Sequence, residues 1–214
     1  MEEFKTILQN STAEVEEKKS KFIADIFYVE NILEAEEKIK SIKKKYFDAR
    51  HHCYAYRIIE ENGVKEKQSD DGEPSGTAGA PMLNILKKNE LINVLVIVTR
   101  YFGGTLLGTG GLVRAYSEAS LKAIEEAGIG VQKFGHELEI IIEYKELERF
   151  KYYCKKHSIN ILEIVYENNI ICKIELTNEE KEELLKNEQK DVQILKYNVL
   201  GEKYIKVEMK NDIT

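Results

Sequence analysis

The chain has 214 residues, ordinary apolar and charged fractions and a formal net charge of −6, which fits one large globular domain or two small ones. The charge is shared evenly between the two halves, so neither half is a bulk basic clamp for nucleic acid, and any phosphate-binding surface must be local. No apolar run has the length of a membrane span, the acidic start lacks a secretory signal, and the three cysteines have neither disulfide nor zinc spacing, so we expect a cytoplasmic protein.

The first half begins with a strand or hairpin, predicted over residues 15–29. A helix follows, because Asn31 is a good N-cap and Glu34, three residues later, completes a capping box. Its apolar residues recur at helical spacing and give one buried face, made of Ile32, Ala35, Ile39, Ile42 and Tyr46. The lysines in residues 38–45 suit the negative pole of the helix dipole and indicate a solvated face.

Three more strands and two helices follow as far as Gly128, which is suited to end the last helix. The Asn62-Gly63 dipeptide predicts a hairpin turn between the first two of these strands. The predicted elements are a strand, a returning strand, a helix, a buried central strand and a long helix (residues 50–60, 64–69, 80–89, 92–102 and 111–128).

The second half has the element order of a ferredoxin-like split βαβ unit. It begins with a strand (residues 136–144), a helix (145–157) and two strands that form a hairpin (159–167 and 170–177). A short helix capped by Thr177 and Glu180 follows before Leu184, and the last strand lies in residues 192–200 or in residues 201–210. We therefore predict an α+β protein of two domains, residues 1–134 and residues 135–214.

Glycine and arginine are concentrated in two segments, DDGEPSGTAGAP at residues 70–81 and TRYFGGTLLGTGGLVRAY at residues 99–116. Eight of the 13 glycines lie between Gly72 and Gly111, although glycine is costly in regular structure. The chain has five arginines against 27 lysines, and four of the five lie in or just before these segments: Arg50, Arg57, Arg100 and Arg114. Because arginine is a planar, always-charged, bidentate donor, these segments indicate either tight internal packing or a recognition surface.

The second segment predicts an anion or nucleic-acid site at the start of a helix. A glycine-rich turn there exposes backbone N–H groups at the positive pole of the helix dipole, and the residues concerned are Gly103, Gly104, Gly108, Thr109, Gly110 and Gly111. Arg114, one turn into the helix, adds a bidentate grip. The segment is neither a P-loop nor a dinucleotide fingerprint, since it lacks the Gly-Lys-Ser/Thr sequence and has Val113 in place of the third glycine. The alternative is close helix–strand packing, with Arg114 paired to Glu118.

Arg100 and Tyr101 end the buried strand beside this turn, where sheets commonly display functional groups. The rings of Tyr101 and Phe102 are both able to stack on a base. The alternative is that one of the two rings covers the edge of the core, and we expect that of Phe102.

The His51-His52-Cys53 sequence lies on a strand, so His51 and Cys53 share one face and His52 lies on the other. His52 joins the recognition surface if it faces the same groove as Arg50, and the alternative is a half-buried histidine with a hydrogen-bond partner. A His-Cys pair with no third group is weak support for catalysis, and we assign no catalytic residue.

The acidic loop offers a choice between a metal site and a turn. Its polar residues are Asp70, Asp71, Glu73, Ser75 and Thr77. Three carboxylates suggest magnesium, but Asp-Gly is an ordinary turn dipeptide, and Ser75 or Thr77 would cap the next helix. A metal site usually draws ligands from several segments, so we favour the turn and predict neither a metal nor a cofactor.

Four motifs that occur in order resemble the IMPACT/YigZ family in its two-domain bacterial form: SKF at Ser20–Phe22, HHCYAYR at His51–Arg57, DDGEPSGTAGAPML at Asp70–Leu83 and VTRYFGGTLLGTGGLVRAYSEA at Val98–Ala119. The resemblance implies an N-terminal domain like domain IV of elongation factor G and a ribosomal-protein domain, with a left-handed βαβ crossover. It implies a C-terminal domain like domain V of the same factor. Eukaryotic relatives bind the activator of the amino-acid-starvation kinase and so restrain translational control.

Three functions are compatible with these observations. The first is a non-enzymatic protein that binds structured RNA, the ribosome or a translation-associated partner. The second is a protein-interaction module of translational or stress control. The third is a small-molecule enzyme that binds phosphate, in which Asp71 or Glu73 would hold magnesium. We predict no membrane partner and no DNA specificity.

Overall fold

The computed structural model describes residues 3–187 and 192–207, which form two compact α+β units. The N-terminal unit comprises residues 4–131, and the C-terminal unit comprises Glu3 and residues 132–207. The long strand β7 (Ile129–Ile142) starts in the first unit and continues in the second. The two-domain α+β class is confirmed, while the predicted boundary at residues 134/135, which falls within β7, stays a prediction.

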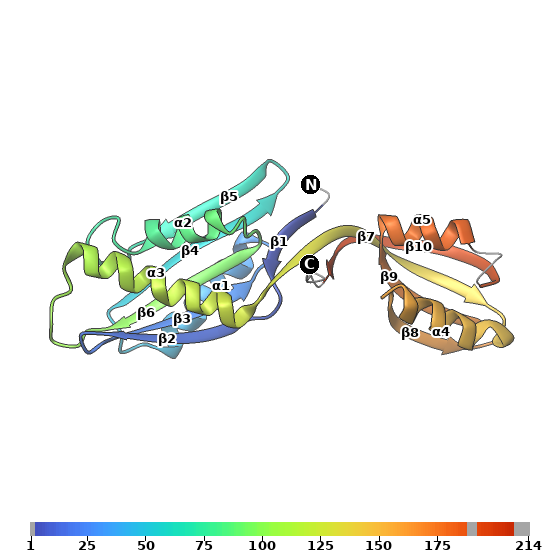
Figure 1. Ribbon diagram of the computed structural model, residues 1–214, viewed down its shortest axis with the longest axis horizontal. Helices are drawn as coiled ribbons and strands as arrows, with labels where there is room; N and C mark the ends of the chain where they lie inside the picture. Colours follow the sequence, from blue (N-terminus) through green and yellow to red (C-terminus); the bar gives the residue numbers. More distant parts are fainter. Residues whose placement is uncertain (1–2, 188–191, 208–214) are drawn as a thin grey trace, which may run out of the picture. The chain divides into compact units, whose positions relative to one another are not determined.

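The N-terminal unit is built on a five-stranded sheet in the order β2-β3-β6-β4-β5 (Figure 1). Its strands are β2 (Ser11–Glu17), β3 (Ser20–Tyr28), β4 (His51–Glu60), β5 (Gly63–Ser69) and β6 (Val94–Tyr101). β6 is central, as predicted, and pairs antiparallel with both β3 and β4. β3 and β4 therefore run parallel to each other on either side of β6.

Helices cover both faces of this sheet, and the alternation of β6 explains why. Val94, Val96 and Val98 pack in the core under α2 (Gly79–Lys88) and α3 (Gly108–Ala127). Leu95 and Ile97 point to the opposite face and pack under α1 (Ile32–Lys45). A strand buried on both sides needs a continuous apolar run, which β6 has.

The helix ends follow local sequence rules. The Asn31 side chain accepts the N–H of Glu34 at 2.9 Å and caps α1, and the Glu34 carboxylate accepts the N–H of Glu30 at 3.0 Å. The predicted apolar face of α1 is confirmed, since Ala35, Ile39 and Ile42 are buried. At the end of α3, Gly128 adopts φ 67°, a conformation that glycine tolerates without strain.

The C-terminal unit has the predicted ferredoxin-like arrangement, with its strands in the order β10-β7-β9-β8. β1 (Glu3–Ile7), most of which belongs to the N-terminal unit, also pairs with β7. After β7 its elements are a 3-10 turn (Tyr144–Glu146), α4 (Leu147–Lys156), β8 (Asn160–Tyr166), β9 (Ile170–Thr177), α5 (Asn178–Asn187) and β10 (Ile194–Val207). The predicted capping box is confirmed, because Thr177 and Glu180 exchange hydrogen bonds of 2.8 and 3.3 Å. β10 joins parts of both segments proposed for the last strand, and residues 208–210 lie outside the described residues.

Within the part of the chain that the structure describes, no helix combines the length and apolar character needed to cross a bilayer.

Candidate nucleic-acid interface

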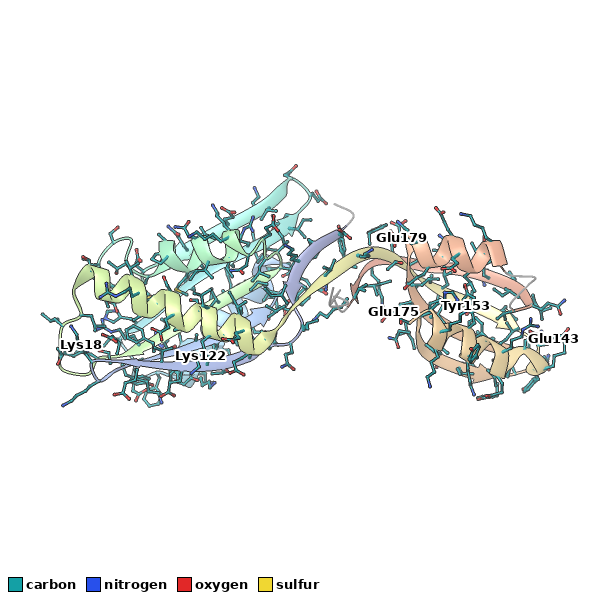
Figure 2. The ribbon with its side chains drawn as sticks, in the orientation of Figure 1. Lys18, Lys122, Glu143, Tyr153, Glu175 and Glu179 are labelled. Carbon is teal, nitrogen blue, oxygen red and sulfur yellow. The ribbon has the colours of Figure 1, made fainter. Side chains whose placement is uncertain are left out.

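Both glycine-rich segments meet at one end of the N-terminal sheet, which we call the tip (residues 18–21, 46–52, 70–78 and 100–114). β6 ends there beside the starts of β3 and β4, since Arg100 is paired in register with His51, and Tyr101 with Lys21. α3 also begins at this end, after the loop that leaves β6 (Figure 1). Figure 2 labels Lys18 in the turn between β2 and β3 at the tip.

Four cationic side chains of the tip are free. Lys18 and Lys19 form the turn between β2 and β3, Arg50 immediately precedes β4, and Arg114 lies on the outer face of α3. All four are exposed, and none makes an ion pair with another of the described residues. In particular, the Arg114–Glu118 pair of the packing alternative does not form between these two described residues. The tip therefore carries four cations that no described ion pair neutralises, and it also carries the carboxylates of Asp48 and Asp70, which bond to the Tyr101 hydroxyl and to backbone N–H groups.

Arg100 lies inside the tip. Its side chain is 7% exposed, and its Nη1 donates to Oε1 of Glu73, whose side chain is 3% exposed, at 2.7 Å. Its Nη2 lies 3.4 Å from the Ser20 hydroxyl. Arg100 thus joins the end of β6 to the acidic loop and to the start of β3, and its charge is already neutralised by a buried partner.

The buried network continues into the core through Tyr116 of α3. The Tyr116 hydroxyl donates to the same Glu73 oxygen at 2.8 Å and is 3.3 Å from the Cys53 sulfur. Burial raises the pKa of Tyr116 well above its ordinary value, and burial likewise raises the pKa of Cys53 to about 12. Both groups therefore stay protonated at neutral pH, which suits a structural role better than a nucleophilic one.

The two aromatic residues after Arg100 have different environments. The Tyr101 hydroxyl donates to Asp48 at 2.7 Å, and this hydrogen bond raises the pKa of Tyr101 to about 12. Phe102 was expected to cover the core edge, but it is 53% exposed. The expectation for Phe102 was wrong because the strand ends at Tyr101, so the alternation of faces does not continue to the next residue.

Arg57 does not belong to the tip. It lies opposite Val94 at the far end of β4, six residues from His51, which corresponds to about 20 Å along a strand. It pairs there with Glu66 at 3.0 Å and donates to the Leu91 carbonyl at 3.1 Å. The grouping of Arg57 with the other arginines was wrong, because nearness in sequence along a strand is not nearness in space.

His52 is buried and makes local hydrogen bonds. Its Nε2 is 3.0 Å from the Tyr46 carbonyl oxygen, and its backbone N–H donates to the Asp71 carboxylate at 2.8 Å. It faces α1, whereas Cys53 faces α2 and α3, so the predicted split between the two faces of the strand is confirmed. His52 therefore supports the tip from inside and is not part of its exposed surface.

The three carboxylates of the acidic loop point to three different sets of partners. Asp70 accepts the N–H groups of Gly76, Ala78 and Gly79 at 2.8–2.9 Å. Burial alone would raise the pKa of Asp70, but these three backbone donors outweigh it and lower the pKa. Asp71 bonds Lys43 and the His52 backbone, and Glu73 bonds Arg100 and Tyr116, as described above.

The cap of α2 differs from the prediction. The expected cap, Ser75 or Thr77, was wrong: Ser75 is exposed, and the Thr77 hydroxyl donates to the Pro74 carbonyl at 2.7 Å. The first N–H groups of the helix bond to Asp70 instead, because the loop folds back and brings that carboxylate to the helix start. Among the described residues, no cluster of three or more His, Cys, Asp or Glu side chains is arranged to hold a metal ion.

The glycines of the second segment have two kinds of environment. A Cβ at Gly103 would lie 2.0–2.3 Å from backbone atoms of Lys19 and Ser20, so this glycine permits close packing of two loops. Gly104 and Gly108 have φ of 86° and 69° and face open space. The first turn of α3, which includes Thr109, Gly110 and Gly111, has no side-chain cap. Gly108, Thr109 and Gly110 are exposed, so their backbone is accessible from solvent.

Two features of the tip were missed by the sequence argument. Lys18 and Lys19 were assigned only to a strand or hairpin, although a lysine pair at a hairpin turn is a signal for exposed charge. The exposure of Phe102 could be predicted only by knowing that β6 ends at Tyr101.

Fold and site together define a two-domain α+β protein with a basic tip on its N-terminal domain. The Impact N-terminal domain family matches residues 18–124. The chain is 38% identical over 177 residues to the IMPACT family member YvyE of Bacillus subtilis, covering 83% of this chain and 80% of that protein. It is 40% identical over 110 residues to the IMPACT family member YigZ of Escherichia coli, covering 51% and 54%. The chain belongs to the IMPACT family.

A solved structure supports the two-domain architecture. The crystal structure of a hypothetical protein aligns with a TM-score of 0.61 at 27% sequence identity and covers 98% of this chain and all of that one.

Proposed function

We propose that this protein is a non-enzymatic binding protein for structured RNA, including ribosomal RNA, that acts in the cytoplasm in the regulation of translation. The observation that carries the proposal is the set of free cations on the tip: Lys18, Lys19, Arg50 and Arg114. Affinity for a phosphate backbone comes from neutralising individual phosphates, so a local cluster is sufficient even in an acidic protein.

The start of α3 supports an anion-binding role for the tip. α1 ends there, and Lys43, Lys44 and Lys45 in its last turn offset the negative pole of its dipole; Lys44 makes no ion pair with any described residue. α3 begins there with uncapped N–H groups, where the dipole favours anions. Its C-terminal Glu125 and Glu126 lie at the opposite end of the unit.

The residues of the proposed interface divide by role. Arg50 and Arg114 are the exposed bidentate donors for phosphate, together with the backbone of Gly104, Gly108, Thr109 and Gly110. Arg100 and Glu73 act inside the tip and hold its loops in position.

The proposed link to translation rests on what the family resemblance of the sequence implies. It implies that eukaryotic relatives bind the activator of the amino-acid-starvation kinase, and that the two domains are like domains IV and V of elongation factor G. These likenesses favour a ribosome-associated role over an unrelated anion-binding role.

A protein-interaction module is the second candidate. It is favoured by Phe47 and Leu106, which are each 83% exposed on segments of the tip. Exposed apolar side chains supply contact area for a protein partner. A phosphate-binding enzyme is less well supported, because Asp70, Asp71 and Glu73 would each have to give up internal hydrogen bonds to hold magnesium.

Co-sedimentation with ribosomes at low and moderate salt tests the proposal. We expect wild-type protein to sediment with ribosomes at low salt and less at moderate salt, and Arg114→Ala to sediment less than wild type at both. The control is Lys65→Ala, which removes an exposed positive charge from β5, opposite Ile58 and far from the tip. Binding that resists nuclease and is equal in Arg114→Ala and wild type would favour the protein-interaction module instead.

A further inference from the structure

Three side chains form a layered stack at the tip. The Arg100 guanidinium lies 5.4 Å from the centroid of the Phe22 ring and 5.6 Å from the centroid of the Phe102 ring. Phe22 is fully buried and Arg100 is 7% exposed, while Phe102 is 53% exposed. The stack therefore runs from the core to the surface and ends in an aromatic ring that is open to solvent.

Contacts with buried residues fix the two inner members of the stack, Phe22 and Arg100. Phe22 packs edge-on against Tyr116, with ring centroids 5.1 Å apart. Arg100 is fixed by Glu73 and by the Ser20 hydroxyl. Such fixed neighbours reduce the conformational entropy that the outermost ring would lose on binding a ligand, and low entropy loss is a property of good contact residues.

The backbone next to Phe102 is also fixed. The N–H of Gly103 donates to the Ser20 hydroxyl at 3.1 Å. A Cβ at Gly103 would clash with the backbone of Lys19, so the loop after Phe102 lies directly against the turn between β2 and β3. The exposed ring is thus joined to one side of the cationic cluster by direct backbone packing.

The chemistry around the ring selects its partner. An exposed aromatic face alone suits any flat apolar group, but here it lies on a tip that carries four free cations. A ligand that offers flat rings and regularly spaced negative charge fits both features. Single-stranded nucleic acid has this combination, because unpaired bases stack on aromatic side chains while their phosphates pair with lysine and arginine.

We propose that Phe102 is a stacking platform for an unpaired base of RNA, so that the tip binds single-stranded loops or bulges in preference to continuous duplex. The inference rests on the proposed RNA-binding function and specifies its partner. Phe102 takes the base, and Lys18, Lys19 and Arg114 bind the neighbouring phosphates. We assign no base to Tyr101, whose hydroxyl donates to Asp48.

The test uses the full-length protein and two RNA probes of equal nucleotide number, a hairpin with an unpaired adenosine-rich loop and a blunt duplex. One loop adenosine is replaced by a fluorescent adenine analogue, whose emission changes when an aromatic ring stacks on it. Wild type is compared with Phe102→Ala and Phe102→Trp. Tyr101→Phe and Leu106→Ala are matched controls from the same segment.

We expect the hairpin to bind more tightly than the duplex. Phe102→Ala weakens hairpin binding by roughly 5- to 150-fold, the range for loss of one base–aromatic stack, and abolishes the fluorescence change. Phe102→Trp retains both, and the two controls bind within about twofold of wild type.

Two results would overturn the inference, and they separate it from the function on which it rests. Salt-dependent RNA binding that is weakened by Arg114→Ala but unchanged by Phe102→Ala would remove the stacking platform and leave the RNA-binding function. No binding of either probe by wild type at low salt would remove both.

Discussion

The Nη1 atom of Arg100 lies 2.7 Å from Oε1 of Glu73, and both side chains are almost completely buried. This ion pair joins the end of the central strand to the loop between β5 and α2, so it ties together the two glycine-rich segments of the chain. Tyr116 donates to the same carboxylate oxygen and ties in α3 as well. The tip therefore depends on an internal charge pair rather than on the regular elements alone.

Glu73→Ala should lower the free energy of unfolding by about 3–5 kcal/mol, because it leaves the Arg100 charge buried without its partner. Urea unfolding measures the change. Glu118→Ala is the control, since Glu118 is exposed on α3, and it should shift stability by no more than about 0.5 kcal/mol. Equal stability of the two variants would show that the pair is not formed in solution.

Gly103→Ala should destabilise the protein, whereas Gly110→Ala should not. A methyl group at Gly103 meets the Lys19 backbone at 2.0–2.1 Å, so the two loops must separate, and we expect a loss of about 1–3 kcal/mol. At Gly110, in the first turn of α3, the nearest atom outside the local helix backbone is a guanidinium nitrogen of Arg114 at 3.7 Å, so alanine should be neutral or stabilise by up to about 1 kcal/mol. Thermal unfolding of the pair tests this, and a stable Gly103→Ala variant would contradict the loop contact.

Asp70→Asn should destabilise the protein at neutral pH by about 1–3 kcal/mol, because the carboxylate accepts three backbone N–H groups. The folded-state pKa of Asp70 lies below its ordinary value, so the carboxylate's stabilisation is present above the unfolded pKa of about 3.9 and is lost as pH falls through the folded value. The difference between wild type and variant should therefore shrink at acid pH. Urea midpoints of the two proteins, measured from neutral to acid pH, test this. A stability difference between wild type and Asp70→Asn that stays constant with pH would contradict it.

The three cysteines should resist thiol reagents in the folded protein. Burial raises the pKa of Cys53 and Cys154 to about 12 and that of Cys172 to about 11, so thiolate is scarce at mildly alkaline pH, and all three side chains are buried. Mass spectrometry after alkylation should find no labelling of native protein and three labels in urea. Rapid labelling of Cys53 alone would contradict the buried network at the tip and would reopen a reactive role for it.

The sequence predicted those parts of the fold that are specified locally. The cap at Asn31, the turn at Asn62-Gly63, the stop at Gly128 and the capping box at Thr177 each depend on residues within four positions of one another. The apolar periodicity of α1 and the continuous apolar run of β6 predicted which faces are buried.

The candidate site was predicted less completely, because its residues come together through strand register. Arg100 and Glu73 are 27 positions apart, and no local pattern shows that they form a pair. Arg57 and Arg50 are close in sequence but lie at opposite ends of β4. Asp70 replaced the expected cap of α2 for the same reason, since only the folded loop brings its carboxylate to the helix start.

The salt dependence of RNA affinity tests the central claim most directly. We would titrate wild type, Arg114→Ala and Lys65→Ala against a hairpin RNA over a range of salt concentrations. The account predicts that the logarithm of affinity falls linearly with the logarithm of salt concentration, that Arg114→Ala reduces the slope by about one, and that Lys65→Ala leaves it unchanged. An affinity that is insensitive to salt, or a slope equal in all three proteins, would contradict an RNA interface at the tip.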